Sequence, residues 1–329
     1  PMPKLPAKPT PVARRRIAKA HDASKAAGYV KAPKAAAAGP VTIEGYEGGP
    51  AATVHIGDCR RVLPTIPEAA AGKVDLIFAD PPFNWSAPYD HWEDNLPHNE
   101  YLDFTYEWVG ACAAALRPGG ALWINIPDDW AAEIVVYLKK LGFELANWCI
   151  WHYRFGQNTR GRFISSKVHA LYFVKPPTER RTWRPLDILE PSDRATTYGD
   201  KRTLSKRDGV PPGMRLPMDV WYGKFWGRVQ GNNKERRSRH HNQLPEIYLA
   251  RVLRACSEEG DLVIDPFLGS GTTGVVARRL KRRFIGVEFS AENARSAAER
   301  IRQGPHRDPM APFPGSAIFQ TRRSLAVEE

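Results

Sequence analysis

At residues 262–273 the chain reads LVIDPFLGSGTT, an apolar run that passes into a glycine turn and then into the start of a helix. Glycines let a ligand lie against the backbone, and the exposed N–H groups of a helix N-terminus favour an electron-rich group. The next apolar run ends in Glu288, where a carboxylate can accept both ribose hydroxyls of a nucleoside. The third glycine of the dinucleotide fingerprint is missing, which disfavours NAD. The pattern predicts a nucleoside site, against the simpler alternative of a tight turn beside a solvated glutamate.

On both sides of this turn, short apolar runs alternate with longer helical stretches, which is typical of an α/β sheet with crossover helices. Arg117-Pro118-Gly119-Gly120 is expected to end one helix, and Asp128 and Asp129 to cap the next, with Gly142 at its C-terminal end. The expected strands are 53–56, 74–79, 121–126, 144–152, 168–174, 262–264 and 283–287, and the expected helices are 98–116, 128–141, 244–257, 272–280 and 291–302.

A second motif follows an earlier strand, where residues 76–84 read LIFADPPFN. Asp80 lies at the carboxyl end of that strand, where open α/β sheets bind ligands, and Pro81 and Pro82 fix the backbone beyond it. An aryl amine is a poor nucleophile, but a carboxylate and an adjacent backbone carbonyl can hold it with its lone pair toward a methyl donor. Phe83 can stack on a base that is flipped out of a duplex. A rigid strand-end turn is the alternative for a single Asp-Pro-Pro.

Composition excludes several classes of protein. The chain has 329 residues, 42% of them hydrophobic, which is enough to bury a full core. No stretch approaches the roughly 20 apolar residues of a membrane span, and the N-terminus lacks the apolar core of a secretory signal, so we expect a cytoplasmic protein. Four cysteines stand far apart without a CxxC pair, which indicates neither a zinc site nor a disulfide framework. We expect ordinary buried thiols at Cys59, Cys112, Cys149 and Cys256.

The formal net charge of +12 is concentrated in two segments. Residues 1–40 carry nine Lys or Arg against one Asp, and residues 176–240 carry fifteen against eight acidic residues, whereas residues 41–175 carry eleven against sixteen. A charge run alone is often a solvated face. Two basic segments that flank a mildly acidic body favour binding of a polyanion. The first segment, rich in Pro, Ala and Lys, is expected to be disordered, either as a phosphate-binding tail or as a solubilising extension.

The two motifs together resemble those of a known enzyme family. Asp80-Pro81-Pro82-Phe83 resembles the catalytic (D/N/S)PP(Y/F/W) motif of amino-group DNA methyltransferases, and Asp265 to Thr272 resembles their FxGxG cofactor motif. The order in this chain, with the catalytic motif first and a variable segment before the cofactor motif, is that of the beta group of the family. The resemblance covers about residues 53–303.

Weaker matches extend the resemblance. Gly57-Asp58 looks like the family's adenine-contacting acidic position, and residues 116–120 resemble the turn after the following helix. Residues 167–175 look like the strand that closes the sheet. His241-Asn242-Gln243-Leu244-Pro245-Glu246 resembles an HPTQKP-type element that contacts the methionine end of the cofactor, although Asn242 and Leu244 depart from the usual residues.

The resemblance implies a seven-stranded, mostly parallel Rossmann-like sheet with helices on both faces, S-adenosylmethionine as cofactor, and no metal. It divides the chain into a disordered basic tail (1–40), a catalytic half (41–175), a loop-rich target-recognition region (176–240), a cofactor-binding half (241–303) and a C-terminal tail (304–329). The implied catalytic residues are Asp80, Pro81, Pro82 and Phe83. The implied cofactor-binding residues are Asp58, His241, Asn242, Gln243, Asp265, Phe267, Gly269, Gly271, Thr272 and Glu288.

The implied substrate is double-stranded DNA with the target base flipped out. Asp80 favours adenine N6, since cytosine N4 enzymes of the family usually carry Ser at this position and the protein- and RNA-directed relatives usually carry Asn. An N4-cytosine enzyme, an RNA methyltransferase and a non-catalytic DNA-binding protein of the same fold are the alternatives. A homodimer, a cognate restriction endonuclease and association with the nucleoid are further implications. In the basic insertion, Trp221 or Trp226 can stack on an unpaired base or pack in the core.

Overall fold

The structure is a computed structural model, which describes residues 39–44, 50–87, 89, 92–153, 161, 163–205, 209–223, 226–229, 233–237 and 242–314. The basic tail up to residue 38, the C-terminal residues from 315 onward and the predicted cofactor contact His241 lie outside the described residues. Within the described residues, no helix is both long and apolar enough to cross a membrane.

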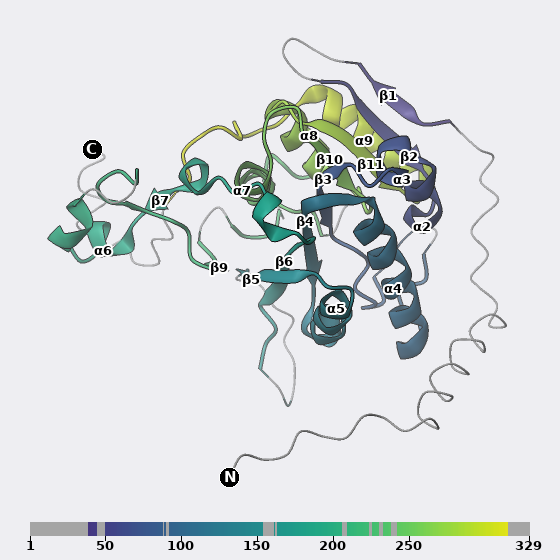
Figure 1. The fold of residues 1–329 in the computed structure, drawn as a ribbon, viewed down its shortest axis with the longest axis horizontal. Coiled ribbons are helices and arrows are strands. Elements are labelled where there is room, and N and C mark those ends of the chain that lie inside the picture. The colour runs from purple at the N-terminus through teal and green to yellow at the C-terminus, as the bar shows by residue number, and fades with distance from the viewer. Residues whose placement is uncertain are drawn as a thin grey trace. The chain divides into compact units, whose positions relative to one another are not determined.

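A large sheet forms the centre of the fold (Figure 1). In the part of the chain that the structure describes it has nine strands in the order β1-β2-β11-β10-β3-β4-β6-β5-β9. The strands from β2 to β4 run parallel, and β6 is antiparallel to both of its neighbours. The bounds are β1 Val41–Ile43, β2 Ala52–Ile56, β3 Val74–Ala79, β4 Leu116–Ile126, β5 Glu144–His152, β6 Lys167–Val174, β9 Val220–Trp221, β10 Leu262–Asp265 and β11 Arg283–Glu288.

The expected α/β class and the mostly parallel sheet are confirmed, but the expected number of seven strands was wrong. The two additional strands lie at the edges of the sheet. β1 pairs antiparallel with β2, and β9 pairs parallel with β5. They have three and two residues, which is too short for the alternating pattern that marks a strand in a sequence.

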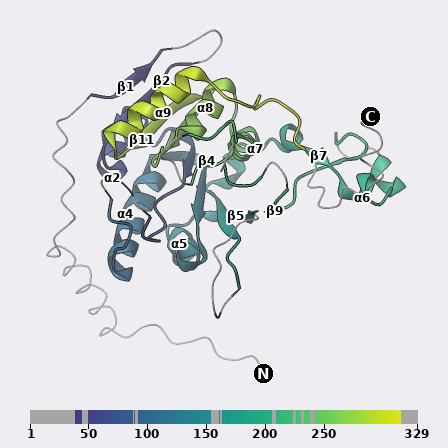
Figure 2. The same ribbon diagram turned by 180° about the vertical axis from the view of Figure 1, so that it is seen from behind.

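Helices cover both faces of the sheet. Figures 1 and 2 show α8 and α9 together on one side of β10 and β11, and α4 and α5 together on the other. α7 packs against α8, and α3 packs against α4. The helices are α2 Cys59–Val62, α3 Pro67–Ala70, α4 His98–Ala115, α5 Asp128–Lys140, α7 Glu246–Cys256, α8 Thr272–Arg279 and α9 Ala291–Gln303, and all four cysteines are buried free thiols, as expected.

Two expectations near β4 and α5 were wrong. Residues 116–120 form the start of β4 rather than a turn, because Gly119 donates its N–H to the Lys175 carbonyl and thereby extends the ladder. Neither Asp128 nor Asp129 caps α5, since Pro127 holds the N-cap position without a side-chain bond. Both aspartates lie in the first turn instead, where a negative charge complements the helix dipole.

The described parts of the 176–240 insertion hold only short elements: η2 Thr178–Arg180, η3 Pro185–Ile188, β7 Glu190–Pro191, α6 Asp193–Thr196, η4 Lys201–Leu204, β8 Met214–Arg215 and the edge strand β9. Trp221 and Trp226 are 5% and 1% exposed, so both pack in the core rather than face an unpaired base. The Arg251 guanidinium of α7 lies 4.0 Å from the Trp226 ring centroid and joins the insertion to the sheet domain.

Candidate active site

A cavity of about 230 Å³ opens where four neighbouring strands end. Asp58 follows β2, Asp80 follows β3, Asp265 ends β10 and Glu288 ends β11, and all four carboxylates belong to its wall. Carboxyl ends of parallel strands meet at one edge of a sheet, and ligands of open α/β sheets bind there. The two sequence motifs, although far apart along the chain, therefore form a single site.

The glycine turn after β10 is shaped for close approach by a ligand. Gly269 and Gly271 adopt positive φ angles of 50° and 80°. A Cβ on Gly271 would lie 3.1 Å from the Ala297 Cβ of α9, so the close packing of α8 on α9 also requires glycine. Gly269 faces the cavity, whereas Gly271 is behind its wall. The prediction of a glycine turn rather than a dinucleotide fingerprint agrees with this geometry.

Glu288 holds the glycine turn in place. Its Oε2 accepts the Gly269 N–H at 2.9 Å and its Oε1 accepts the Ser290 N–H at 3.0 Å. Burial raises the pKa of the Glu288 carboxyl, and these backbone donors oppose the rise. The Glu288 side chain also lines the cavity, so its carboxylate is within reach of the hydroxyl groups of a ligand there.

Asp58 combines two contacts at the far end of the cavity. Its carboxylate caps α2 through the Arg60 N–H at 3.0 Å and forms an ion pair with the Arg60 guanidinium at 2.6 Å. Arg60 also contacts Glu107 of α4 at 2.6 Å. The acidic position that was expected near the adenine is therefore oriented by a cation, and both of its carboxylate oxygens accept bonds from Arg60.

The Asp80 side chain is partly buried and lies in the cavity wall. Desolvation there raises its pKa to about 7, the neighbouring Asn125 amide opposes the rise, and the Asp265 charge adds to it. Asn125 in turn accepts the Tyr248 hydroxyl at 2.6 Å. Burial likewise raises the pKa of Asp265 to about 7. Two such groups on one cavity wall are typical of a functional site.

Two of the three backbone carbonyl groups that follow Asp80 accept hydrogen bonds from side chains of neighbouring helices. Tyr101 of α4 donates its hydroxyl to the Pro82 carbonyl at 2.6 Å, and Trp130 of α5 donates its indole N–H to the Phe83 carbonyl at 3.0 Å. Among the described residues no donor contacts the Pro81 carbonyl. The Pro81 carbonyl is thus the one of the three without a donor among the described residues, and Pro81 itself is buried next to the cavity.

Most of the predicted site residues come together. Asp58, Asp80, Pro82, Asn242, Gln243, Asp265, Phe267, Gly269, Thr272 and Glu288 line the cavity. Phe83 does not: it is 9% exposed and packs edge-on against Trp85, with ring centroids 5.3 Å apart. Pro81 and Gly271 also lie outside the lining. The lining residues that sequence reasoning missed include the aromatic groups Phe78, Tyr89, Trp92 and Phe104, of which the last three lie outside the quoted motifs.

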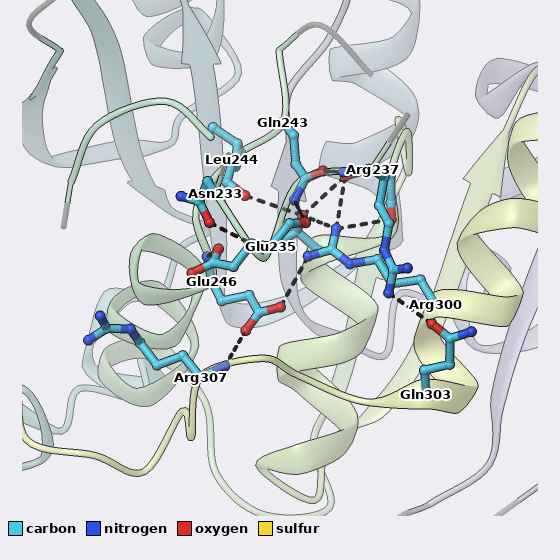
Figure 3. Close-up of polar contacts among 11 residues, drawn as sticks. Asn233, Glu235, Arg237, Gln243, Leu244, Glu246, Arg300, Gln303 and Arg307 are labelled. Carbon is cyan, nitrogen blue, oxygen red and sulfur yellow. Dashed lines mark hydrogen bonds and ion pairs between the residues drawn. The ribbon is translucent and has the colours of Figure 1, made fainter. Parts of the chain in front are cut away.

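A buried ion pair supports the cofactor side of the cavity from behind (Figure 3). Arg300 of α9 and Glu246 of α7 meet at 3.1 Å, and each side chain is 1% exposed. Arg300 also donates to the Ser270 carbonyl at 3.1 Å and to the Thr272 hydroxyl at 2.8 Å. These bonds tie the glycine turn and the start of α8 to both neighbouring helices.

Gln243 is fixed by the last described part of the insertion. Its amide donates to the Glu235 carbonyl at 2.5 Å and accepts the Arg237 N–H at 2.9 Å, as Figure 3 shows. The Glu235 carboxylate accepts the Glu246 N–H at 2.9 Å at the start of α7. The predicted methionine-end element is thus in contact with both the cavity and the insertion.

The wall suits a nucleoside that carries positive charge. Asp58 and Glu288 offer carboxylate acceptors for amino and hydroxyl groups, and Asp80 and Asp265 supply potential negative charge at the other end. Gly57 and Gly269 leave backbone without side chains in the wall. These residues fit a sulfonium nucleoside such as S-adenosylmethionine.

Residues 74–299 match the family model N6_N4_Mtase, which is described as DNA methylase. The chain belongs to the N6/N4 DNA methylase family. Its class is therefore an S-adenosylmethionine-dependent DNA amino-methyltransferase, as the sequence motifs predicted.

Curated relatives of this N6/N4 methylase are type II methyltransferases. M.HpaI of Haemophilus parainfluenzae is 30% identical over 244 residues, which are 74% of this chain and 73% of that protein. M.BamHI of Bacillus amyloliquefaciens is 34% identical over 256 residues, 76% of this chain and 56% of that protein. M1.MboII of Moraxella bovis is 34% identical over 230 residues, 68% of this chain and 87% of that protein.

Solved structures share the fold of this methylase. The cytosine-N4-specific PvuII DNA methyltransferase has a TM-score of 0.56 at 19% identity, over 78% of this chain and 87% of that one. TTHA0409 of Thermus thermophilus, a putative DNA modification methylase in complex with S-adenosyl-L-methionine, has a TM-score of 0.51 at 26% identity, over 77% and 95%. The first likeness concerns the fold alone.

Proposed function

We propose that this methylase transfers a methyl group from S-adenosylmethionine to the N6 amino group of adenine in double-stranded DNA. The observation that carries the proposal is the position of Asp80, the first residue of an Asp-Pro-Pro-Phe motif, in the wall of the same cavity as Asp265 and Glu288. Asp at this position is the feature that distinguishes adenine N6 enzymes from most cytosine N4 enzymes in the family that the motif resembles.

The amine is held by two acceptors in this account. The ionised Asp80 carboxylate accepts one N–H bond, and the Pro81 carbonyl accepts the other, since Tyr101 and Trp130 already use the carbonyls of Pro82 and Phe83. Two acceptors on the two N–H groups turn the nitrogen lone pair away from them and toward the cofactor side of the cavity. The contribution is positioning and electrostatics in a site that excludes water.

S-adenosylmethionine supplies an electrophilic methyl group when it is bound. The residues proposed to bind it are Glu288 at the ribose, Asp58 at the adenine, and Asp265 and Gly269 along its length. Asn242 and Gln243, which line the cavity beside the start of α7, are proposed for the methionine end, together with His241 outside the described residues. Phe83, being packed on Trp85, would have to turn its ring to stack on a flipped base.

The 176–240 insertion is proposed to read the target sequence. Its arginines can contact guanine edges or phosphates, and its described part is joined to the cavity wall through Gln243. Relatives named as type II methyltransferases support a companion restriction endonuclease for this chain as well. A homodimer and association with the nucleoid are parts of the same proposal.

Transfer of a labelled methyl group tests the proposal. The purified protein is incubated with labelled S-adenosylmethionine, unmethylated genomic DNA and structured RNA in competition, and the modified positions are mapped by sequencing. We expect label in duplex DNA at adenines of one sequence motif. Label in RNA, or at cytosines, contradicts the proposal, and absence of S-adenosylmethionine binding would support a non-catalytic DNA-binding protein.

A further inference from the structure

A segment whose described residues form no helix joins the catalytic motif to α4, and hydrogen bonds connect its two ends. The Asn84 side chain donates to the Leu96 carbonyl at 2.8 Å and accepts the Leu96 N–H at 2.7 Å. Asn84 has a φ angle of 60°, a left-handed conformation that asparagine tolerates better than most residues. The reciprocal pair joins the two ends of the segment from residue 84 to residue 96, and we call its described residues (84–87, 89 and 92–96) the motif loop.

One carboxylate organises the backbone at this neck. Asp94 is 3% exposed, and its two carboxylate oxygens accept the N–H groups of Asn84 at 2.8 Å, Trp85 at 2.9 Å and Ala87 at 2.9 Å. Its own carbonyl accepts the Ser86 N–H at 2.5 Å. Hydrogen bonds to a charged acceptor are roughly twice as strong as neutral ones, so Asp94 is the main anchor of residues 84–87.

The opposite side of the same backbone is anchored by aromatic residues. Tyr101 bonds to the Pro82 carbonyl and Trp130 to the Phe83 carbonyl. Hydrogen bonds from α4, from α5 and to Asp94 of the motif loop therefore hold the backbone between residues 82 and 87. Asp80 and the Pro81 carbonyl are the next groups toward the sheet.

The motif loop also forms part of the cavity. Ala87, Tyr89 and Trp92 line it together with Asp80 and Pro82. The Ala87 N–H is one of the three donors to Asp94. A change at Asp94 therefore acts on both the catalytic motif and the loop that encloses the substrate, although Asp94 is not a lining residue itself.

We propose that Asp94 is a positioning residue for methyl transfer, which sets the backbone after Asp80 so that the carboxylate and the Pro81 carbonyl face the amine together. The proposal rests on the proposed function of the site. Misplacement of reacting groups by about 1 Å can cost about 100-fold in rate. Asp94 bonds to the backbone after the catalytic motif and has no hydrogen bond to the glycine turn among the described residues, so we expect its loss to lower the transfer rate more than the cofactor affinity.

The test compares Asp94→Asn with Glu93→Gln. Asparagine keeps the shape of Asp94 but removes the charge and turns one acceptor into a donor that faces backbone N–H groups. Glu93 is its exposed neighbour and loses the same charge without these bonds. We expect kcat of Asp94→Asn to fall by about 10- to 100-fold while its Kd for S-adenosylmethionine stays within about threefold of the wild type, and Glu93→Gln to behave as the wild type.

Two results would overturn the assignment of Asp94. One is a kcat of Asp94→Asn within about threefold of the wild type; the other is a loss of cofactor affinity as large as the loss of kcat. If Asp94→Asn does not fold, as judged by its thermal unfolding curve, Asn84→Gly replaces it, because glycine accepts the same φ angle but loses the Leu96 bonds. A fall of its kcat by about fivefold or more, with unchanged cofactor Kd, supports the proposal, and an unchanged kcat opposes it.

The test of Asp94 can fail without the proposed function failing. Failure of the wild-type protein to methylate any DNA base refutes the proposed function. A wild-type enzyme that methylates DNA, next to an Asp94→Asn variant that does so equally well, refutes only the role of Asp94.

Discussion

Asp80 and Asp265 lie in the wall of one cavity, and the pKa of each carboxyl group is raised to about 7, chiefly by desolvation in that wall. An exposed aspartate ionises at a pKa of about 3.9, so both groups keep their protons over a pH range in which surface carboxylates are charged. Asp80 and Asp265 therefore become negatively charged near neutral pH. The proposed methyl transfer depends on the charge of Asp80, and the proposed cofactor binding depends on that of Asp265.

The first prediction concerns the pH dependence of transfer. Asp80 must be ionised to accept the amine N–H bond, so kcat/KM for DNA should rise between about pH 6 and pH 8 and level off above. A pH–rate profile at subsaturating cofactor measures it, because the positive charge of bound cofactor would itself lower the pKa of Asp80. The same profile for Asp80→Asn, which cannot ionise, should be low and flat, whereas a wild-type profile without any change across this range would contradict the role of Asp80.

The second prediction concerns cofactor affinity. S-adenosylmethionine carries positive charge, and Asp265 gains its negative charge as pH rises through about 7. The Kd for the cofactor, measured by calorimetry, should therefore decrease from about pH 6 to about pH 8. In Asp265→Asn this pH dependence should be reduced, while the Asp80→Ala variant should bind the cofactor nearly as well as the wild type and transfer no methyl group.

The third prediction separates two requirements at Gly271. Gly271→Ala meets both an unfavourable φ angle of 80° and the Ala297 Cβ at 3.1 Å, whereas Gly142→Ala meets a φ angle of 87° with nothing within 4 Å. We expect both variants to lose about 1 kcal/mol of unfolding free energy from backbone strain. Only Gly271→Ala should also bind S-adenosylmethionine more weakly, by about tenfold or more. Equal cofactor affinity in the two variants would argue against a role of this turn in binding.

The fourth prediction concerns the ion pair behind the turn. Arg300→Met leaves the Glu246 carboxylate buried without its cation, which should lower the unfolding free energy by about 3 to 5 kcal/mol. The control is Arg302→Gln, whose arginine is 46% exposed and contacts only Glu299 among the residues that the structure describes. Denaturant unfolding of both variants measures the difference. A loss in Arg300→Met no larger than in Arg302→Gln would show that the pair contributes little.

The sequence was most informative where an apolar strand ends in a polar residue. The strands before Asp80 and before Asp265 are short apolar runs, and each places a polar residue at a strand end, so both the sheet and the meeting of the two motifs could be predicted. The bounds of β3 and β5 were predicted as observed. Their apolar residues are nearly continuous, and the chain marks their ends with charged residues or turns.

The contacts that complete the site could not be predicted in this way. Asp94, Tyr101 and Trp130 act through bonds to backbone groups 7 to 47 residues away, which leave no periodic signal. Arg300 reads as a charged position on an amphipathic helix, yet it is 1% exposed because Glu246 and the glycine turn surround it. Asp128 was expected as a cap because local sequence could not reveal Lys167 and His169, its partners on β6.

The identity of the methylated nucleoside shows whether Asp80 directs transfer to adenine N6. Duplex DNA is methylated to completion by the wild-type protein and, in parallel, treated with Asp80→Ala, then digested to nucleosides and analysed by mass spectrometry. We expect N6-methyldeoxyadenosine with the wild type and no methylated nucleoside with the variant. N4-methyldeoxycytidine in the wild-type digest would contradict this expectation.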